Sequence, residues 1–131
     1  MLSGNLQKKL ALFLCVFLSC VFAKVQLNDP YVRVAKIMVD SSQLKTYMSF
    51  LKEGVEAAIE KEPGVLQMYA VAEKNHPHSI TIIETYASKA AYESHIQSAH
   101  FQKYKQGTLA MVRSLDLRDV VPLGGTSPEK K

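Results

Sequence analysis

Two histidines, His95 and His100, are the residues of this 131-residue sequence best suited to carry out chemistry. They lie in a stretch, residues 82–104, that gathers more titratable groups among apolar neighbours than any other part of the chain. Imidazole exchanges a proton near neutral pH, so either ring is a candidate general base. For His95 a structural interpretation is equally open, in which the ring lies in the core and binds a backbone carbonyl or a tyrosine hydroxyl.

The spacing of these two histidines argues against a metal site. Residues five positions apart are separated by about 140° around an ideal helix, whereas paired zinc ligands on a helix usually lie four apart. The two rings would converge on one ion only if the helix broke between them, and Ser98 is a plausible position for such a break. His76 and His78 have no third ligand nearby in the sequence, so we expect both to be exposed loop residues.

A carboxylate, Glu84, interrupts an apolar face of a predicted strand, which it shares with Ile80, Ile82 and Tyr86. A carboxylate in such a place needs a partner or a raised pKa. Lys36, which interrupts an apolar face of another predicted strand, is the expected partner. A structural ion pair is therefore one interpretation of Glu84, and a role in a site is the other.

Two aromatic residues, Phe101 and Tyr104, follow His100 along the predicted second helix. We interpret both as core residues or as the wall of a pocket. Tyr104 lies one turn after His100, so a hydrogen bond between these two side chains is expected.

The elements that position these side chains follow from hydrophobic periodicity. Alternating apolar residues predict strands at 31–39, 65–73, 79–86 and 114–122. Helical spacing predicts helices over about 43–62 and from Ser88 to about 112, the second broken near Ser98 or Gly107. The order strand, helix, strand, strand, helix, strand is a ferredoxin-like, split βαβ arrangement, an α+β fold with a four-stranded antiparallel sheet.

The predicted strands are largely apolar on both faces, although the two helices can cover only one face of a four-stranded sheet. The second face therefore needs another cover. A twofold partner that presents the same face is the most economical one, so the sequence predicts a homodimer.

The first 23 residues are typical of a secretory signal peptide. Lys8 and Lys9 precede an apolar run over residues 10–22, which is short for a transmembrane span, and cleavage is predicted after Ala23. A retained anchor and a lipoprotein with lipid on Cys20 are the alternatives. We assign residues 24–30 to a linker, 31–123 to the domain and 124–131 to a flexible tail, and predict an exported protein, periplasmic or secreted.

Removal of this leader changes the composition of the mature chain. Both cysteines, Cys15 and Cys20, are lost with it, which excludes disulfides and thiol chemistry. The mature chain keeps 14 basic and 12 acidic residues without a basic cluster, so it has no electrostatic reason to bind nucleic acid. After cleavage, no membrane partner is expected.

The segment H-x-x-S-x-H-F, at His95, Ser98, His100 and Phe101, resembles the antibiotic biosynthesis monooxygenase (ABM) family, and within it the small quinol monooxygenases. The resemblance extends over about residues 31–123. It implies a dimeric α+β barrel, in which two sheets close on each other. It also implies oxygenation of an electron-rich aromatic, such as a quinol or polyketide phenol, by dioxygen without metal, haem or flavin.

In that chemistry the resemblance implies that His95 or His100 deprotonates the substrate, and the resulting anion passes an electron to dioxygen. Glu84, Tyr86 and Tyr104 would orient the substrate.

Two other functions stay open. Some relatives degrade haem with a ligating histidine, an asparagine and a tryptophan, but this chain has no tryptophan, and Lys105 stands where that histidine would be. An exported dimeric barrel that binds a hydrophobic small molecule without converting it fits the same residues.

Overall fold

The computed structural model describes residues 29–125. The predicted signal peptide lies outside the described residues, as do most of the predicted linker and tail, so these assignments stay predictions. Within the described part of the chain, no helix has the length and apolar character needed to cross a membrane.

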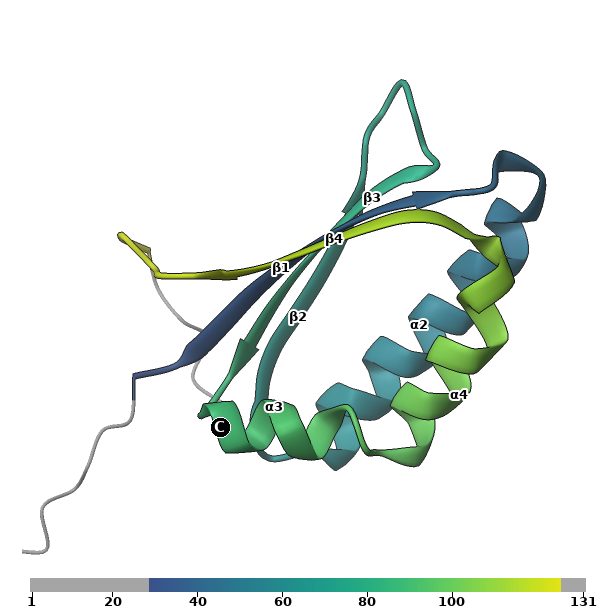
Figure 1. The fold of residues 1–131 in the computed structure, drawn as a ribbon. Helices are drawn as coiled ribbons and strands as arrows, with labels where there is room; N and C mark the ends of the chain where they lie inside the picture. Colours follow the sequence, from purple (N-terminus) through teal and green to yellow (C-terminus); the bar gives the residue numbers. More distant parts are fainter. Residues whose placement is uncertain (1–28, 126–131) are drawn as a thin grey trace, which may run out of the picture.

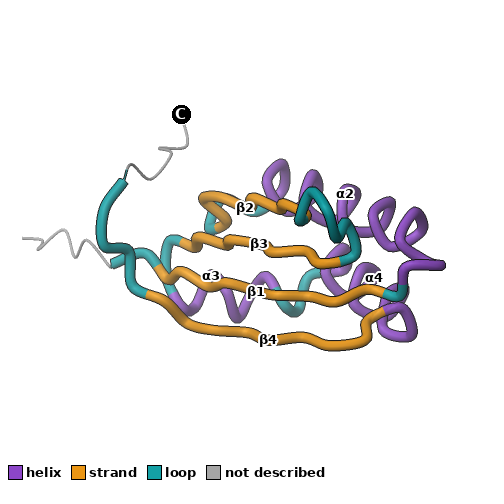
Figure 2. Tube along the Cα trace, turned by 90° about the horizontal axis from the view of Figure 1, so that it is seen from above, coloured by secondary structure: helices purple, strands orange, loops and turns teal. Residues whose placement is uncertain are grey.

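Four strands form one antiparallel sheet in the order β2-β3-β1-β4 (Figure 2). They are β1 (Tyr31–Val39), β2 (Val65–Ala72), β3 (Ser79–Tyr86) and β4 (Val112–Val120). The bounds of β1 and β3 agree with the prediction, β2 ends one residue earlier, and β4 is displaced by two residues toward the N-terminus. The predicted ferredoxin-like α+β topology is confirmed.

The helices all lie on one side of this sheet (Figure 1). They are the short η1 (Ser41–Gln43), α2 (Leu44–Lys61), α3 (Lys89–His95), α4 (Ala99–Thr108) and the short η2 (Leu109–Met111). Figure 1 shows α2 and α4 side by side, with α3 crossing near one end of the strands. The predicted long second helix is therefore two helices, and the predicted break near Ser98 is confirmed.

Local sequence signals explain where these helices begin and end. The Ser88 hydroxyl accepts a hydrogen bond from the Ala91 amide (3.1 Å), and Ser98 caps α4 in the same way. Pro63 restricts the preceding residue, Glu62, to an extended backbone (φ −110°, ψ 103°), which ends α2.

The core lies between the helices and one face of the sheet. It is built mainly from Ala35, Ile37 and Val39 of β1, Ile80 and Ile82 of β3, and Tyr47 and Leu51 of α2. The opposite face is uncovered in the single chain and exposes Met38, Tyr69, Val71, Ile83 and Val120. Strands that are apolar on both faces are thus confirmed for β1 and β2, while the homodimer inferred from them stays a prediction.

Candidate active site

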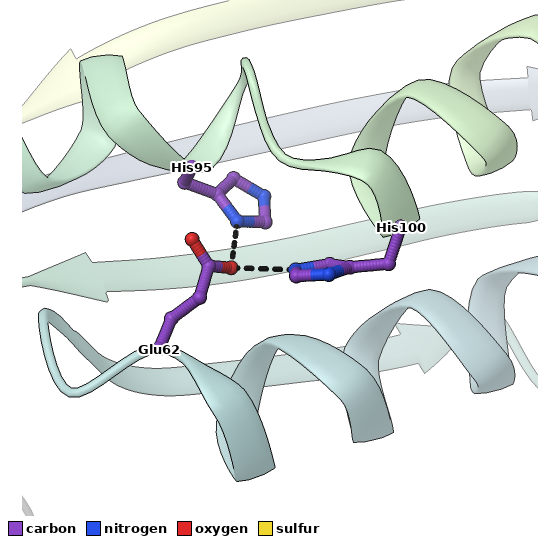
Figure 3. A group of neighbouring side chains, drawn as sticks. All are labelled: Glu62, His95 and His100. Atoms are coloured by element: carbon purple, nitrogen blue, oxygen red, sulfur yellow. Dashed lines mark hydrogen bonds and ion pairs between the residues drawn. The ribbon is translucent and has the colours of Figure 1, made fainter.

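Three side chains from three different elements meet on the helix side of the sheet (Figure 3). Glu62 follows α2, His95 is the last residue of α3, and His100 lies in the first turn of α4. One carboxylate oxygen, Glu62 Oε2, lies 2.6 Å from His95 Nδ1 and 2.7 Å from His100 Nε2. His95 is 4% exposed, and the side chains of Glu62 and His100 are each 16% exposed. The two predicted catalytic histidines are therefore brought together by a carboxylate.

The turn between α3 and α4 is what makes the two histidines converge. The helix stops after His95, and Ser98 starts the next one, so His100 is no longer displaced around the same helix axis. The Gln102 side-chain amide donates to the Ile96 carbonyl (2.7 Å) and holds the turn. The sequence-based reason for expecting no metal site assumed an unbroken helix, and it does not apply here.

The charge of Glu62 decides how the two histidines are protonated. Burial raises the pKa of Glu62, but the hydrogen bonds from His95 and His100 outweigh burial and bring this pKa below its ordinary value. The ionised carboxylate can only accept, so each imidazole donates an N–H to it. His95 therefore carries its proton on Nδ1, and Nε2 has no hydrogen-bond partner among residues 29–125. That nitrogen is left as an acceptor.

His95 forms one end of a small inner cavity of about 30 Å³. Its walls are mostly apolar, from Leu51 and Val55 of α2 and Met68 of β2, and Glu84 lies on the same wall. The His95 ring packs against Phe101, with ring centroids 5.0 Å apart. The imidazole is thus held in a fixed orientation next to an apolar hollow.

A larger outer cavity of about 290 Å³ adjoins the inner one. Both cavities are lined by Ile82, Glu84, Phe101 and Tyr104, so they are two parts of one hollow. The outer part lies between α4 and the β1–β4 half of the sheet. Leu115 and Leu117 of β4, which are 54% and 45% exposed, form part of its floor. A small apolar molecule could lie here with one end toward His95.

Lys105 of α4 also lines the outer cavity. A lysine at this place, in a chain without tryptophan, does not supply the residues that the haem-degrading relatives use. The geometry therefore gives no support to a haem-degrading function.

Glu84 is the one carboxylate that lines both cavities. Burial raises its pKa above the ordinary range, only partly offset by a hydrogen bond from the Tyr86 hydroxyl (3.2 Å) and by the charge of Arg33. The predicted pairing with Lys36 is wrong: Lys36 is paired with Thr81 and faces the other side of the sheet, while Arg33 lies opposite Glu84.

Both tyrosines that were predicted to bind substrate have different surroundings from those expected. Tyr86 is fully buried, lines neither cavity and donates its hydroxyl hydrogen bond to Glu84. Tyr104 lines both cavities, but its hydroxyl binds that of Tyr47 (2.6 Å), so the predicted hydrogen bond to His100 is wrong. Phe101 lies in both cavity walls, as predicted.

Comparison with known proteins agrees with this architecture. The model of the family described as antibiotic biosynthesis monooxygenase matches residues 30–107, most of the described chain. The chain belongs to this family. The family assignment supports a general monooxygenase-like function that acts on a small molecule.

Solved structures of similar proteins have the same fold. A Bacteroides thetaiotaomicron protein, provisionally described as an ABM monooxygenase, is 48% identical over 78% of this chain and 97% of its own, with a TM-score of 0.74. A Lactobacillus acidophilus protein, provisionally described as a monooxygenase, is 26% identical over 72% of this chain and 45% of its own (TM-score 0.70). A Pseudomonas aeruginosa protein at 22% identity (76% and 99%, TM-score 0.69) shares the fold alone. No curated protein matches the chain.

Proposed function

We propose that this ABM family member oxygenates an electron-rich aromatic, a quinol or a polyketide-like phenol, with His95 as the general base. The observation that carries the proposal is the position of His95 between an ionised carboxylate, Glu62, and an apolar hollow. Oxygenation of this kind needs a base in a site from which water is excluded, because a phenolate in water is stabilised by solvent and protonated again.

Glu62 is a positioning residue in this mechanism. Its carboxylate accepts the Nδ1 proton of His95 and so holds the tautomer in which Nε2 can accept a proton from the substrate hydroxyl. Once the imidazole becomes positively charged, the negative charge of Glu62 stabilises it. The same division of roles is found in hydrolases with a buried carboxylate behind a histidine.

Glu84 is proposed to act as a proton donor, whereas His95 acts as a proton acceptor. Burial raises the pKa of Glu84 and so favours the protonated carboxyl group more than in an exposed glutamate; in that form it would donate to an oxygen of the substrate on which negative charge develops. Phe101 and Tyr104 provide flat apolar walls on which an aromatic ring can pack. The deprotonated ring then passes an electron to dioxygen. One oxygen atom is added to the ring carbon, and the other leaves as water with two hydrogen atoms from the substrate.

The test is oxygen uptake with 1,4-naphthoquinol, with a panel of other quinols and phenols as further substrates. After treatment with a chelator, the wild type should still consume oxygen faster than the autoxidation of the substrate. His95→Gln should lower kcat roughly 100-fold or more, the usual scale of general base catalysis. Glu62→Gln, which keeps the shape and removes the charge, should also lower kcat while changing KM little.

The matched control is His76→Ala, in the exposed loop between β2 and β3, which should keep the wild-type rate. Oxygen uptake by the wild type that only equals autoxidation across the panel would contradict the proposal. It would favour a dimeric barrel that binds a hydrophobic small molecule without converting it.

A further inference from the structure

We propose that Glu62, His95 and His100 also form a binding site for a divalent transition-metal ion, with zinc as the preferred ion. In this proposal His95 either binds the ion or acts as the general base, and it cannot do both at once. The three ligand atoms, one carboxylate oxygen and two ring nitrogens, all lie within 4.8 Å of one another (Figure 3). The first half of this proposal is independent of the proposed function. The second half rests on it.

The donor set suits zinc. Two imidazole nitrogens and one carboxylate oxygen are a common set of three protein ligands for this ion, with a water molecule in the fourth position. Ligand atoms around a tetrahedral zinc ion lie about 3.3 Å apart, since each is about 2.0–2.1 Å from the ion. The carboxylate oxygen is 2.6 and 2.7 Å from the two nitrogens, and all three atoms lie within 4.8 Å of one another, so each distance must change by about 1.5 Å at most.

The surroundings allow that opening and give the ion a way in. Glu62 follows the last residue of α2, and rotation about its own side-chain bonds can supply the change in distance. The side chains of Glu62 and His100 are each 16% exposed, so the cluster is in contact with solvent, and His100 also lines a small hollow of about 10 Å³ with Glu53 and Lys103. The His95 ring is fixed by Phe101 and Tyr86, with centroids 5.0 and 5.5 Å away, so one ligand is already in place.

Metal binding and base catalysis place opposite demands on the His95 ring. Without an ion, Nδ1 carries the proton and donates it to Glu62, so Nε2 has a free electron pair. An ion bound at Nδ1 takes the electron pair of that nitrogen, and the single proton of the neutral ring must move to Nε2. The number of protons on the ring is unchanged, but Nε2 turns from an acceptor into a donor. The metal-bound protein therefore lacks its base.

Binding is tested on the full mature chain, stripped with a chelator and titrated with zinc chloride in a calorimeter. We expect one ion per chain, and His100→Gln should weaken binding by about 100-fold or more, because the loss of a residue that only supports a ligand already costs roughly 10–100-fold. The matched control is the double variant His76→Ala/His78→Ala, which removes the two loop histidines and should leave the affinity unchanged. The proposal is overturned if zinc does not bind, or if binding survives His100→Gln and is lost in the loop variant.

The tautomer is read by nitrogen NMR of the histidine rings, which needs no substrate and no variant. Zinc should move the protonated nitrogen of His95 from Nδ1 to Nε2. Zinc binding that leaves the His95 proton on Nδ1 would refute the site.

In an active preparation, zinc should inhibit quinol oxygenation over the concentration range in which it binds, and a chelator should reverse the inhibition. Full activity of the zinc-saturated protein would refute the claim that ion and base exclude each other. A preparation with no quinol activity would refute the proposed function alone, because the calorimetry and NMR do not use it.

Discussion

Glu62 joins two histidines that are 33 and 38 positions away in the chain, and its position in the helical pattern sets it apart from the other charges of that segment. It comes seven, four and three residues after Val55, Ala58 and Ile59, so hydrophobic periodicity places it on the apolar face of the helix, where a carboxylate needs a partner. Its role follows from Pro63, which turns the chain out of the helix, and from the break at Ser98. The sequence therefore carries a signal that Glu62 is buried, but it does not identify the two histidines that Glu62 contacts.

Asp40, which precedes η1, allows a sharp prediction about pH. The Ser42 hydroxyl, the Ser42 amide and then Arg113 lower the pKa of Asp40 from 3.8 to about 2. A carboxylate whose pKa is lower in the folded state stabilises the fold above its unfolded pKa, and this contribution is lost as the pH falls toward the folded value. Asp40→Asn should therefore lower the free energy of unfolding at neutral pH, and the difference from the wild type should shrink between about pH 4 and pH 2.

Urea unfolding of both proteins at several pH values measures this difference. Asp29→Asn, at the start of the described chain, is the matched control for the change in net charge. A difference between Asp40→Asn and the wild type that stays constant from neutral pH to pH 2 would contradict the assignment.

The turn that precedes β2 packs closely against α3, one of the elements that carry the site. A Cβ atom added at Gly64 would lie 2.7 Å from the Cβ of Ala91, which belongs to the same short helix as His95. Gly64→Ala should therefore push α3 outward and lower the free energy of unfolding by about 1–3 kcal/mol, the usual cost of overpacking. Because α3 carries His95, the variant should also lose activity.

Chemical denaturation measures the loss, and Gly124→Ala is the control, since nothing lies within 4 Å of a Cβ there. A Gly64→Ala protein as stable as the wild type would show that α3 can move away without cost.

Elements and their ends could be predicted from the sequence because their causes are local. Apolar alternation placed β1 and β3, and serine caps placed the starts of α3 and α4. Partners across the fold could not be predicted in this way. A one-residue change of register moves a side chain to the other face of a sheet, which is why Lys36 was paired wrongly with Glu84. The Tyr104 hydroxyl forms its hydrogen bond with Tyr47 on another helix, and not with His100, which lies one turn away on the same helix.

For the whole molecule, the uncovered face of the sheet predicts a homodimer. Tyr69 and Ile83, 59% and 38% exposed, lie opposite each other on neighbouring strands of this face, with Val34 opposite Ile83 on the other side and Val71 two residues from Tyr69. A contiguous apolar patch of this kind on a sheet is typical of a buried interface. Sedimentation equilibrium of the mature chain at micromolar concentration should give twice the monomer mass.

A pair of matched variants locates that interface. Ile83→Lys puts a charge on the uncovered face and should shift the equilibrium to monomers, because an unpaired buried charge is costly. Met48→Lys makes the same change on the exposed side of α2 and should leave the dimer intact. Wild-type chains that sediment as monomers would show that this face is stable in water.

The strand β4 borders the outer cavity but pairs only with β1, at the edge of the sheet. It contributes none of the residues that hold or move a proton, and the family match ends at residue 107, before this strand begins. Changes at exposed positions such as Leu115 and Leu117 cost little stability, usually within about 0.5 kcal/mol. Substitutions in this one edge strand can therefore change which substrate fits the outer cavity, while Glu62, His95 and His100 stay unchanged.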